Sequence, residues 1–206
     1  MIDSTCFLCS PDSNLVVART KTAYAMVGFG PITTTYAILA SRAHLPSLAD
    51  RAAADPTAIA EIERLRHELE SIRGPLLMTE HGRVPVCRDD GDQHDAHCFH
   101  AHGLIFAQHG SVLQHALSYY SRSALYPDLQ SALAAAAKEE AYLLCSEGID
   151  RYQILSGSLN VPRQLTRTLA ALAAGEGPLA DWRVSPRKSE ASRMADSLRS
   201  ALRERS

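Results

Sequence analysis

Short runs of alternating hydrophobic and polar residues fill the first part of the chain, with one longer helical pattern among them. The alternation and the turn residues that bound it predict strands over residues 14–19, 23–29, 35–40 and 76–79. Asp55-Pro56 predicts a helix start and Gly74-Pro75 its end. Apolar residues recur between them at helical spacing: Ile59, Ile62, Leu65, Leu69 and Ile72. We therefore expect an antiparallel sheet with one long helix packed across it.

The second half of the chain mixes helical and strand patterns. We expect helices over residues 129–141 and 162–172 and after Ser185-Pro186, and a short hairpin from residues 141–145 and 152–155. The predicted fold class is α+β. It has a first domain at residues 1–115 and a mixed extension at residues 116–206 packed on it.

The segment Cys98-Phe99-His100-Ala101-His102-Gly103-Leu104-Ile105-Phe106 carries the strongest chemical signal. Read as a strand, it places Cys98, His100, His102 and Leu104 on one face. Two imidazoles two residues apart on one strand face can converge on a single metal or phosphorus atom. The alternative is a pair of hydrogen-bonded core histidines.

Cys6-Phe7-Leu8-Cys9 is the second chemical signal. A Cys-x-x-Cys knuckle supplies half of a tetrahedral zinc site, and His44 and His100 are candidates for the other two ligands. A redox pair is the competing interpretation, but no strand precedes the motif and no βαβ pattern surrounds it. Two unconnected buried thiols are the structural alternative.

Composition narrows the class of protein. The chain has 206 residues, a formal net charge of −2 and five cysteines. This charge argues against a nucleic-acid-binding surface. No apolar run of membrane-spanning length and no signal-peptide pattern is present in the sequence, so we expect a cytoplasmic protein without a membrane partner. Arg163 and Arg167 lie one helical turn apart, where they either clamp a phosphate or, as burial statistics favour, face solvent.

Four segments in register resemble the histidine-triad (HIT) superfamily of nucleotidyl hydrolases and transferases. They are Cys6-x-x-Cys9, residues 31–44 (PITTTYAILASRAH), Thr79-Glu80-His81-Gly82 and His100-Ala101-His102-Gly103. The segment of residues 100–106 is also similar to the His-Pro-His-Gly-Gln motif of the galactose-phosphate uridylyltransferases. The match spans about residues 6–106. Residues 162–167 and 181–183 are weakly similar to the C-terminal extension of some larger bacterial members.

The resemblance implies a role for each matching residue. Zinc-containing members hold a structural zinc ion with the residues at the positions of Cys6, Cys9, His44 and His100. The second motif histidine, here His102, attacks a phosphorus atom and forms a nucleotidyl-histidine intermediate. A neighbouring carbonyl holds its other ring nitrogen. The implied partner is a nucleotide or a nucleotide-derived small molecule, and pairing through the sheet and helix implies a homodimer.

Three positions depart from the family pattern. Leu104 replaces the third motif histidine or glutamine, and Tyr36 replaces an upstream histidine. His97 stands where a serine or glycine often binds phosphate. We expect His97 to act with His102 in catalysis. The residues expected to bind substrate are Tyr36, Glu80, His81 and Leu104.

Three functions agree with these residues. The first is a HIT-like hydrolase or transferase that acts through His102. The second is a degenerate member that binds a nucleotide or a partner without turnover, which Leu104 and Tyr36 favour. The third is a metal-dependent enzyme whose catalytic ion is held by His97, His100 and His102 with Glu80 or Asp95.

Overall fold

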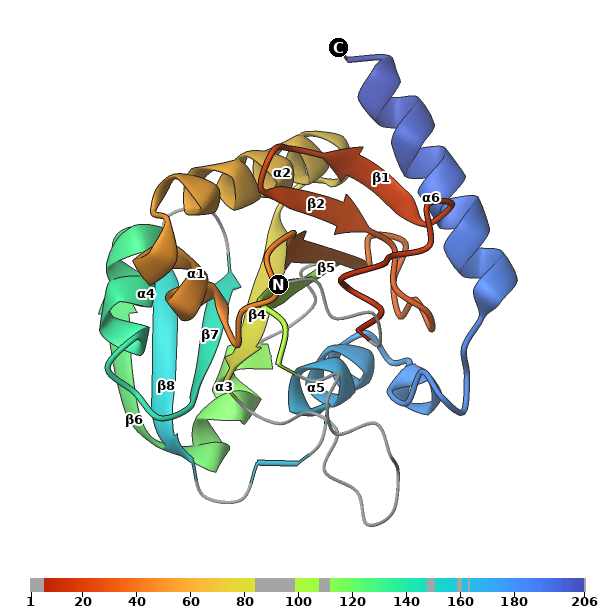
Figure 1. Ribbon diagram of the computed structural model, residues 1–206. Coiled ribbons are helices and arrows are strands. Elements are labelled where there is room, and N and C mark those ends of the chain that lie inside the picture. The colour runs from red at the N-terminus through yellow and green to blue at the C-terminus, as the bar shows by residue number, and fades with distance from the viewer. Residues whose placement is uncertain are drawn as a thin grey trace.

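A single antiparallel sheet runs through the computed structural model, which describes residues 6–83, 99–107, 112–147, 151–158, 161–162 and 164–205 (Figure 1). Its eight strands stand in the order β1-β2-β3-β5-β4-β7-β8-β6, and every neighbouring pair is antiparallel. The strands are β1 (Val16–Arg19), β2 (Ala23–Met26), β3 (Ala37–Ser41), β4 (Leu76–Gly82), β5 (His102–Ala107), β6 (Tyr120–Tyr126), β7 (Tyr142–Glu147) and β8 (Tyr152–Ser158).

Six α-helices surround this sheet within the described residues. They are α1 (Leu48–Ala54), α2 (Thr57–Arg73), α3 (Val112–Ala116), α4 (Leu129–Ala136), α5 (Leu165–Ala173) and α6 (Lys188–Arg203). Two short 3₁₀ turns, η2 (Leu117–Tyr119) and η3 (Gly177–Leu179), complete the described elements. Figure 1 shows α6 at the margin of the molecule beside β1, whereas α1, α2 and α4 pack against other strands of the sheet.

Helix α2 forms where the sequence predicts it. The Asp55 carboxylate accepts hydrogen bonds from the backbone N–H and the hydroxyl of Thr57, which satisfies a free donor at the helix start. Gly74 ends the helix with φ at 79°, a left-handed conformation that glycine adopts at little cost. The apolar face that the spacing predicts is buried at Ile59, Ile62, Leu65 and Leu69.

The two faces of the sheet have different surroundings. Ser146, Met78 and Ile105 are register partners across β7, β4 and β5, and Ser146 accepts a hydrogen bond from Arg66 of α2. Ile105 therefore faces the layer of α1, α2 and α4. Because side chains alternate along a strand, His102 and Leu104 project from the opposite face. We call the first the helix face and the second the histidine face.

Most of the predicted elements are confirmed, with shifted ends. The α+β class, the first four strands, the long helix and the 142–158 hairpin are present. The predicted strand over residues 98–106 begins at His102, because His100 turns away to other partners, and Cys98 lies outside the described residues. The helix predicted over residues 129–141 ends at Ala136, and the last two helices begin a few residues later than predicted.

Strand β6 is absent from the prediction. Five of its seven residues are exposed, so no hydrophobic alternation marks it in the sequence. Strand β7 pairs directly with β4 over six residue pairs, from Leu77–Glu147 to Gly82–Tyr142. The sheet is thus continuous across the predicted domain boundary at residue 115, which falls between β5 and β6.

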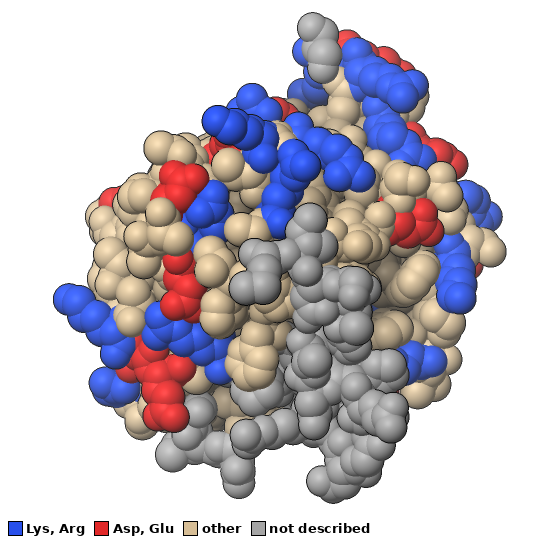
Figure 2. Space-filling view, viewed as in Figure 1, with Lys and Arg blue, Asp and Glu red and all other residues tan. Residues whose placement is uncertain are grey.

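The helices of the described ranges are too short or too polar to span a bilayer. On the face of the molecule shown in Figure 2, Lys and Arg side chains along α6 are accompanied by Asp and Glu side chains.

Candidate metal centre and histidine site

The Cys6–Cys9 segment is a tight turn fastened to the sheet. The N–H groups of Cys9 and Ser10 both donate to the carbonyl of Cys6, at 3.0 and 3.3 Å. The hydroxyl of Tyr24, on β2, donates to the carbonyl of Leu8 at 2.5 Å. These contacts hold the two cysteines against the end of the sheet, with Cys6 buried and Cys9 partly buried.

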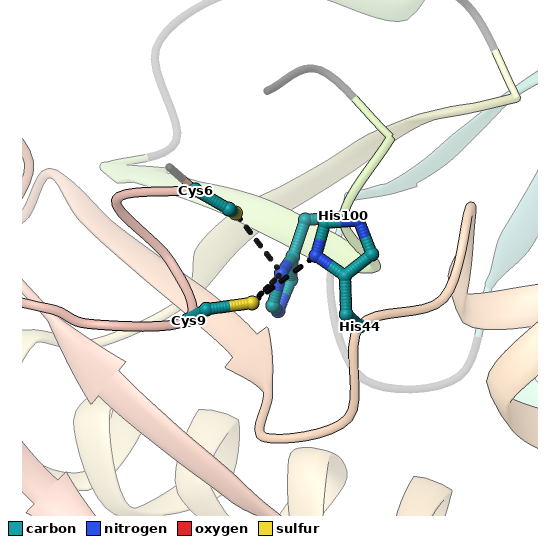
Figure 3. A group of neighbouring side chains, drawn as sticks. All are labelled: Cys6, Cys9, His44 and His100. Carbon is teal, nitrogen blue, oxygen red and sulfur yellow. Dashed lines mark hydrogen bonds between the residues drawn. The ribbon is translucent and has the colours of Figure 1, made fainter. Parts of the chain in front are cut away.

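Two histidines from distant segments meet these thiols (Figure 3). His44 follows β3, and its Nδ1 lies 3.1 Å from the Cys9 sulfur. His100 precedes β5, and its Nδ1 lies 3.4 Å from the Cys6 sulfur and 3.7 Å from the Cys9 sulfur. The four ligand atoms lie within 4.8 Å of one another. The four residues predicted as metal ligands therefore form one cluster that could hold a metal ion.

The hydrogen bonds of His100 prepare it for metal binding. Its Nε2 lies 2.6 Å from the carbonyl oxygen of Ser41, which can only accept, so Nε2 carries the proton. The lone pair on Nδ1 then points at the two sulfurs. Metal-binding histidines generally have such a second hydrogen bond, which fixes the tautomer and the ring orientation.

Burial also favours the neutral ring at this cluster. Burial lowers the pKa of His100 to about 4 and raises the pKa of the Cys6 thiol. A neutral imidazole is the form that binds a metal, whereas a thiol must lose its proton to do so. A bound cation would reverse the effect of burial on the thiols, because it stabilises the thiolate directly.

His102 is the first residue of β5, and only one of its two ring nitrogens is hydrogen-bonded within the described residues. Its Nδ1 lies 2.6 Å from the carbonyl oxygen of His100, so Nδ1 carries the proton. This is the hydrogen bond that the family resemblance predicts. Burial lowers the pKa of His102, which keeps the ring neutral. The Nε2 lone pair makes no hydrogen bond within the described residues and is available as a nucleophile.

His81 lies next to His102 on the histidine face. Thr79 of β4 and Leu104 of β5 are register partners, and His81 and His102 each lie two residues farther along. Burial lowers the pKa of His81 to about 4, so this ring is neutral as well. Its Nε2 lies 2.9 Å from the hydroxyl of Tyr120 at the start of β6.

Glu80 points to the helix face, away from His102. One carboxylate oxygen accepts from the N–H of Leu48 at 2.5 Å, and the other accepts from the hydroxyl of Tyr142 at 2.6 Å. Burial raises the pKa of Glu80 to about 8. The structure thus separates Glu80 from the histidines with which the sequence grouped it, because adjacent residues of a strand face opposite sides.

Leu104 and Tyr36 take different positions. Leu104 lies on the histidine face, partly buried, two residues from His102. Tyr36 is 3% exposed, with its ring centroid 5.4 Å from that of Phe106 and 4.8 Å from the guanidinium carbon of Arg167. These contacts enclose the Tyr36 ring, and its assignment to the substrate site stays a prediction. His97 and Asp95 lie outside the described residues.

Arg167 differs from its predicted solvent-facing position, and Arg163 lies outside the described residues. Arg167 is 3% exposed and donates hydrogen bonds to the carbonyls of Gly30, Leu179 and Ala180. Leu179 and Ala180 lie shortly after α5 in the chain, whereas Gly30 is 137 positions away. The arginine therefore ties the extension to the first part of the chain.

Tyr120 is the residue of this site that sequence reasoning missed. It begins a strand without hydrophobic alternation, and its partner His81 is 39 positions away. No signal in the sequence marks the pair, because the contact depends on how β6 follows η2. No protein-family model matches this chain, and a search of curated proteins finds no match either. The interpretation of the site therefore rests on its geometry.

Proposed function

We propose that this protein is a HIT-like hydrolase or transferase that moves a nucleoside monophosphate through a covalent intermediate on His102. The observation that carries the proposal is the 2.6 Å hydrogen bond from Nδ1 of His102 to the His100 carbonyl, which leaves Nε2 as a directed lone pair. A neutral, oriented imidazole on a partly open strand face is the arrangement that nucleophilic catalysis by histidine needs.

The reaction has two displacements. The Nε2 lone pair of His102 forms a bond to phosphorus, and the bond from phosphorus to the leaving group breaks with its electron pair. The leaving group takes a proton from solvent, and the positive charge on the His102 ring is stabilised by the Nδ1–H···O hydrogen bond. Water or another acceptor then attacks phosphorus and gives its proton to solvent, and the P–N bond breaks with its electron pair returning to Nε2, which regenerates His102.

His81 supplies a donor that Leu104 cannot. In our proposal the Tyr120 hydroxyl donates to Nε2 of His81, so that Nδ1–H of His81 donates to a phosphoryl oxygen at His102. Support comes from the 2.9 Å Tyr120–His81 contact and from the shared face of His81 and His102. One donor to a transition-state oxygen typically contributes about 3 kcal/mol.

We propose zinc as the ion for the Cys6, Cys9, His44 and His100 cluster. Tetrahedral zinc, with Zn–S near 2.3 Å and Zn–N near 2.0 Å, places sulfur and nitrogen ligands about 3.5 Å apart. Three of the four S···N distances are 3.1, 3.4 and 3.7 Å. Four protein ligands leave no open position, so zinc acts structurally by fixing His100, whose carbonyl orients His102.

Intact-protein mass spectrometry tests the covalent step. The protein is incubated briefly with nucleoside phosphoramidates, dinucleoside polyphosphates and nucleotide sugars, alongside His102→Ala and His67→Ala. His67 is an exposed histidine of α2 and serves as the matched control. We expect a mass gain of one nucleoside monophosphate in the native protein and in His67→Ala, and none in His102→Ala.

Binding without turnover is the second candidate function. Leu104 favours it, because a leucine at this position neither contacts a phosphate nor assists a leaving group. This function predicts nucleotide binding with no adduct and no product across the whole panel, while the metal content stays intact. That result would reject the covalent mechanism.

A further inference from the structure

A second candidate site lies at the opposite end of β5 from His102. There, a cleft of about 660 Å³ opens between the turn at residues 31–34, the C-terminal ends of α2 and α5, and α6. Ala107, the last residue of β5, donates its N–H to the Thr33 hydroxyl of this turn. His102 is the first residue of the same strand, so the two ends are about 17 Å apart at 3.3 Å per residue.

One side of α6 forms a wall of this cleft. Its lining residues recur at helical spacing: Arg187, Glu190, Arg193, Met194 and Ser197. The facing wall contains Arg73, the last residue of α2, and Glu176, which follows α5. The cleft is therefore lined by side chains from three separate parts of the chain.

Arg73 and Arg187 face this cleft without a carboxylate partner among the described residues. The other arginine of the cleft, Arg193, lies 3.5 Å from Glu190. Elsewhere, the buried arginines Arg51 and Arg66 each pair with a carboxylate, and Arg167 donates to three backbone carbonyls. A partly buried guanidinium without a counter-charge favours binding of an anion from solution.

Hydrogen bonds hold both of these arginines in place but use few of their donors. Nη2 of Arg73 donates to the Ser197 hydroxyl at 3.1 Å, while its Nε is buried without a partner in the described residues. Nη1 of Arg187 donates to the carbonyl of Pro31 at 2.6 Å. Arg187 also has φ at 41°, a left-handed conformation that is unfavourable for a residue with a side chain.

We propose that this cleft binds a phosphomonoester that also carries hydroxyl groups, such as a sugar phosphate. The guanidinium groups of Arg73 and Arg187 receive the phosphate, because their planar donor pairs match its oxygens. The hydroxyls of Thr33 and Thr34 and the carboxylate of Glu176 hydrogen-bond to the hydroxyl groups. This site is independent of the reaction proposed at His102.

Calorimetric titration with ribose 5-phosphate tests the site, with ribose as the uncharged control. Arg73→Gln and Arg187→Gln each remove a guanidinium, and Arg64→Gln removes an exposed one from the same helix α2 as a matched control. We expect each cleft variant to weaken binding at least about tenfold, and Arg64→Gln and His102→Ala to leave it unchanged. Ribose alone should not bind.

Arg187→Gly separates a binding role from a folding role. Glycine adopts the left-handed conformation freely, which offsets the lost hydrogen bond to the Pro31 carbonyl, so this variant should unfold at about the same denaturant concentration while it loses binding. If no binding is detected at ribose 5-phosphate concentrations up to about 10 mM, the proposal is overturned. Binding by Arg73→Gln and Arg187→Gln that is as tight as binding by the native protein would overturn it as well. Loss of binding in His102→Ala would have the same consequence.

Discussion

Two adjacent ionisable residues of β4 project to opposite faces of the sheet and have different hydrogen-bond partners there. Glu80 turns to the helix face, where the Leu48 N–H and the Tyr142 hydroxyl satisfy both of its carboxylate oxygens. His81 turns to the histidine face beside His102, whose Nε2 has no hydrogen-bond partner within the described residues. The first arrangement stabilises the fold, and the second leaves Nε2 of His102 available for chemistry.

This difference shows that a shifted pKa does not by itself identify a functional site. Burial shifts the pKa of Glu80 upward and that of His81 downward, both by amounts that are common at active sites. Only the histidine face combines neutral rings with an oriented, unused lone pair. The free atom, together with the groups that orient it, distinguishes a candidate catalytic group from a structural one.

Loss of a ligand of the proposed metal ion should have the largest effect on the histidine face. Cys9→Ser removes a ligand of the proposed ion and should lower the free energy of unfolding by about 4 kcal/mol, because metal binding contributes directly to folding. The melting temperature should fall by about 10 °C. Metal content from mass spectrometry and a thermal unfolding curve measure both effects.

Cys145→Ala is the control for this prediction. Cys145 is buried on β7 and is not one of the four clustered residues, so its truncation should lower stability and leave the metal content unchanged. Equal metal content in Cys9→Ser and in the native protein would show that Cys9 is not a ligand.

On the helix face, Glu80→Gln should remove a pH dependence of stability. The folded-state pKa of Glu80 is about 8, above its ordinary value of 4.5, so the folded protein holds a proton that the unfolded chain releases. Its contribution is complete below pH 4.5 and is lost as pH rises to 8. The loss is on the order of 4 kcal/mol, and denaturant unfolding at several pH values measures it.

Glu61→Gln gives a control of opposite sign. Hydrogen bonds from Thr20 and Thr22 lower the pKa of Glu61 to about 2, so its contribution is present above pH 4.5 and lost as pH falls to 2. If the native protein and Glu80→Gln show parallel stability curves from pH 5 to pH 8, Glu80 does not titrate in this range.

Tyr120→Phe should weaken the histidine face without removing its nucleophile. Loss of the hydroxyl frees His81 to change tautomer, and we expect adduct formation at His102 to slow about tenfold. Long-range nitrogen NMR of the His81 ring reports the tautomer directly. Tyr126→Phe, at the other end of β6, is the matched control, and an equal effect of the two variants would assign Tyr120 a structural role only.

Leu104→Gln should have the smallest effect and the opposite sign. It introduces a polar side chain on the same face as His102 and should speed adduct formation a few-fold, equivalent to about 1 kcal/mol. Leu104→Met keeps the apolar volume and should leave the rate unchanged. A slower reaction in Leu104→Gln would indicate that the leucine packs against the substrate.

Local patterns in the sequence predicted much of this fold and its cluster of two cysteines and two histidines. The spacing of apolar residues predicted α2, and the Cys-x-x-Cys knuckle with His44 and His100 predicted the cluster. Strand parity over residues 79–82 separates Glu80 from His81, but the strand predicted from the sequence ends at residue 79. Strand β6 was missed because its exposed residues show no alternation, and Arg167 was misplaced because one of its carbonyl partners, Gly30, is 137 positions away in the sequence.

The sequence by itself determined which residue types can carry chemistry here and on which strand they lie, because turn residues and the periodicity of apolar positions act over a few residues. Tertiary structure alone decided which of them meet and which atoms stay free. The Ser41 carbonyl fixes the tautomer of His100, the His100 carbonyl fixes that of His102, and the Tyr120 hydroxyl reaches His81. Except for the His100–His102 bond, these contacts join segments far apart in the chain, and their geometry depends on how the whole sheet is assembled.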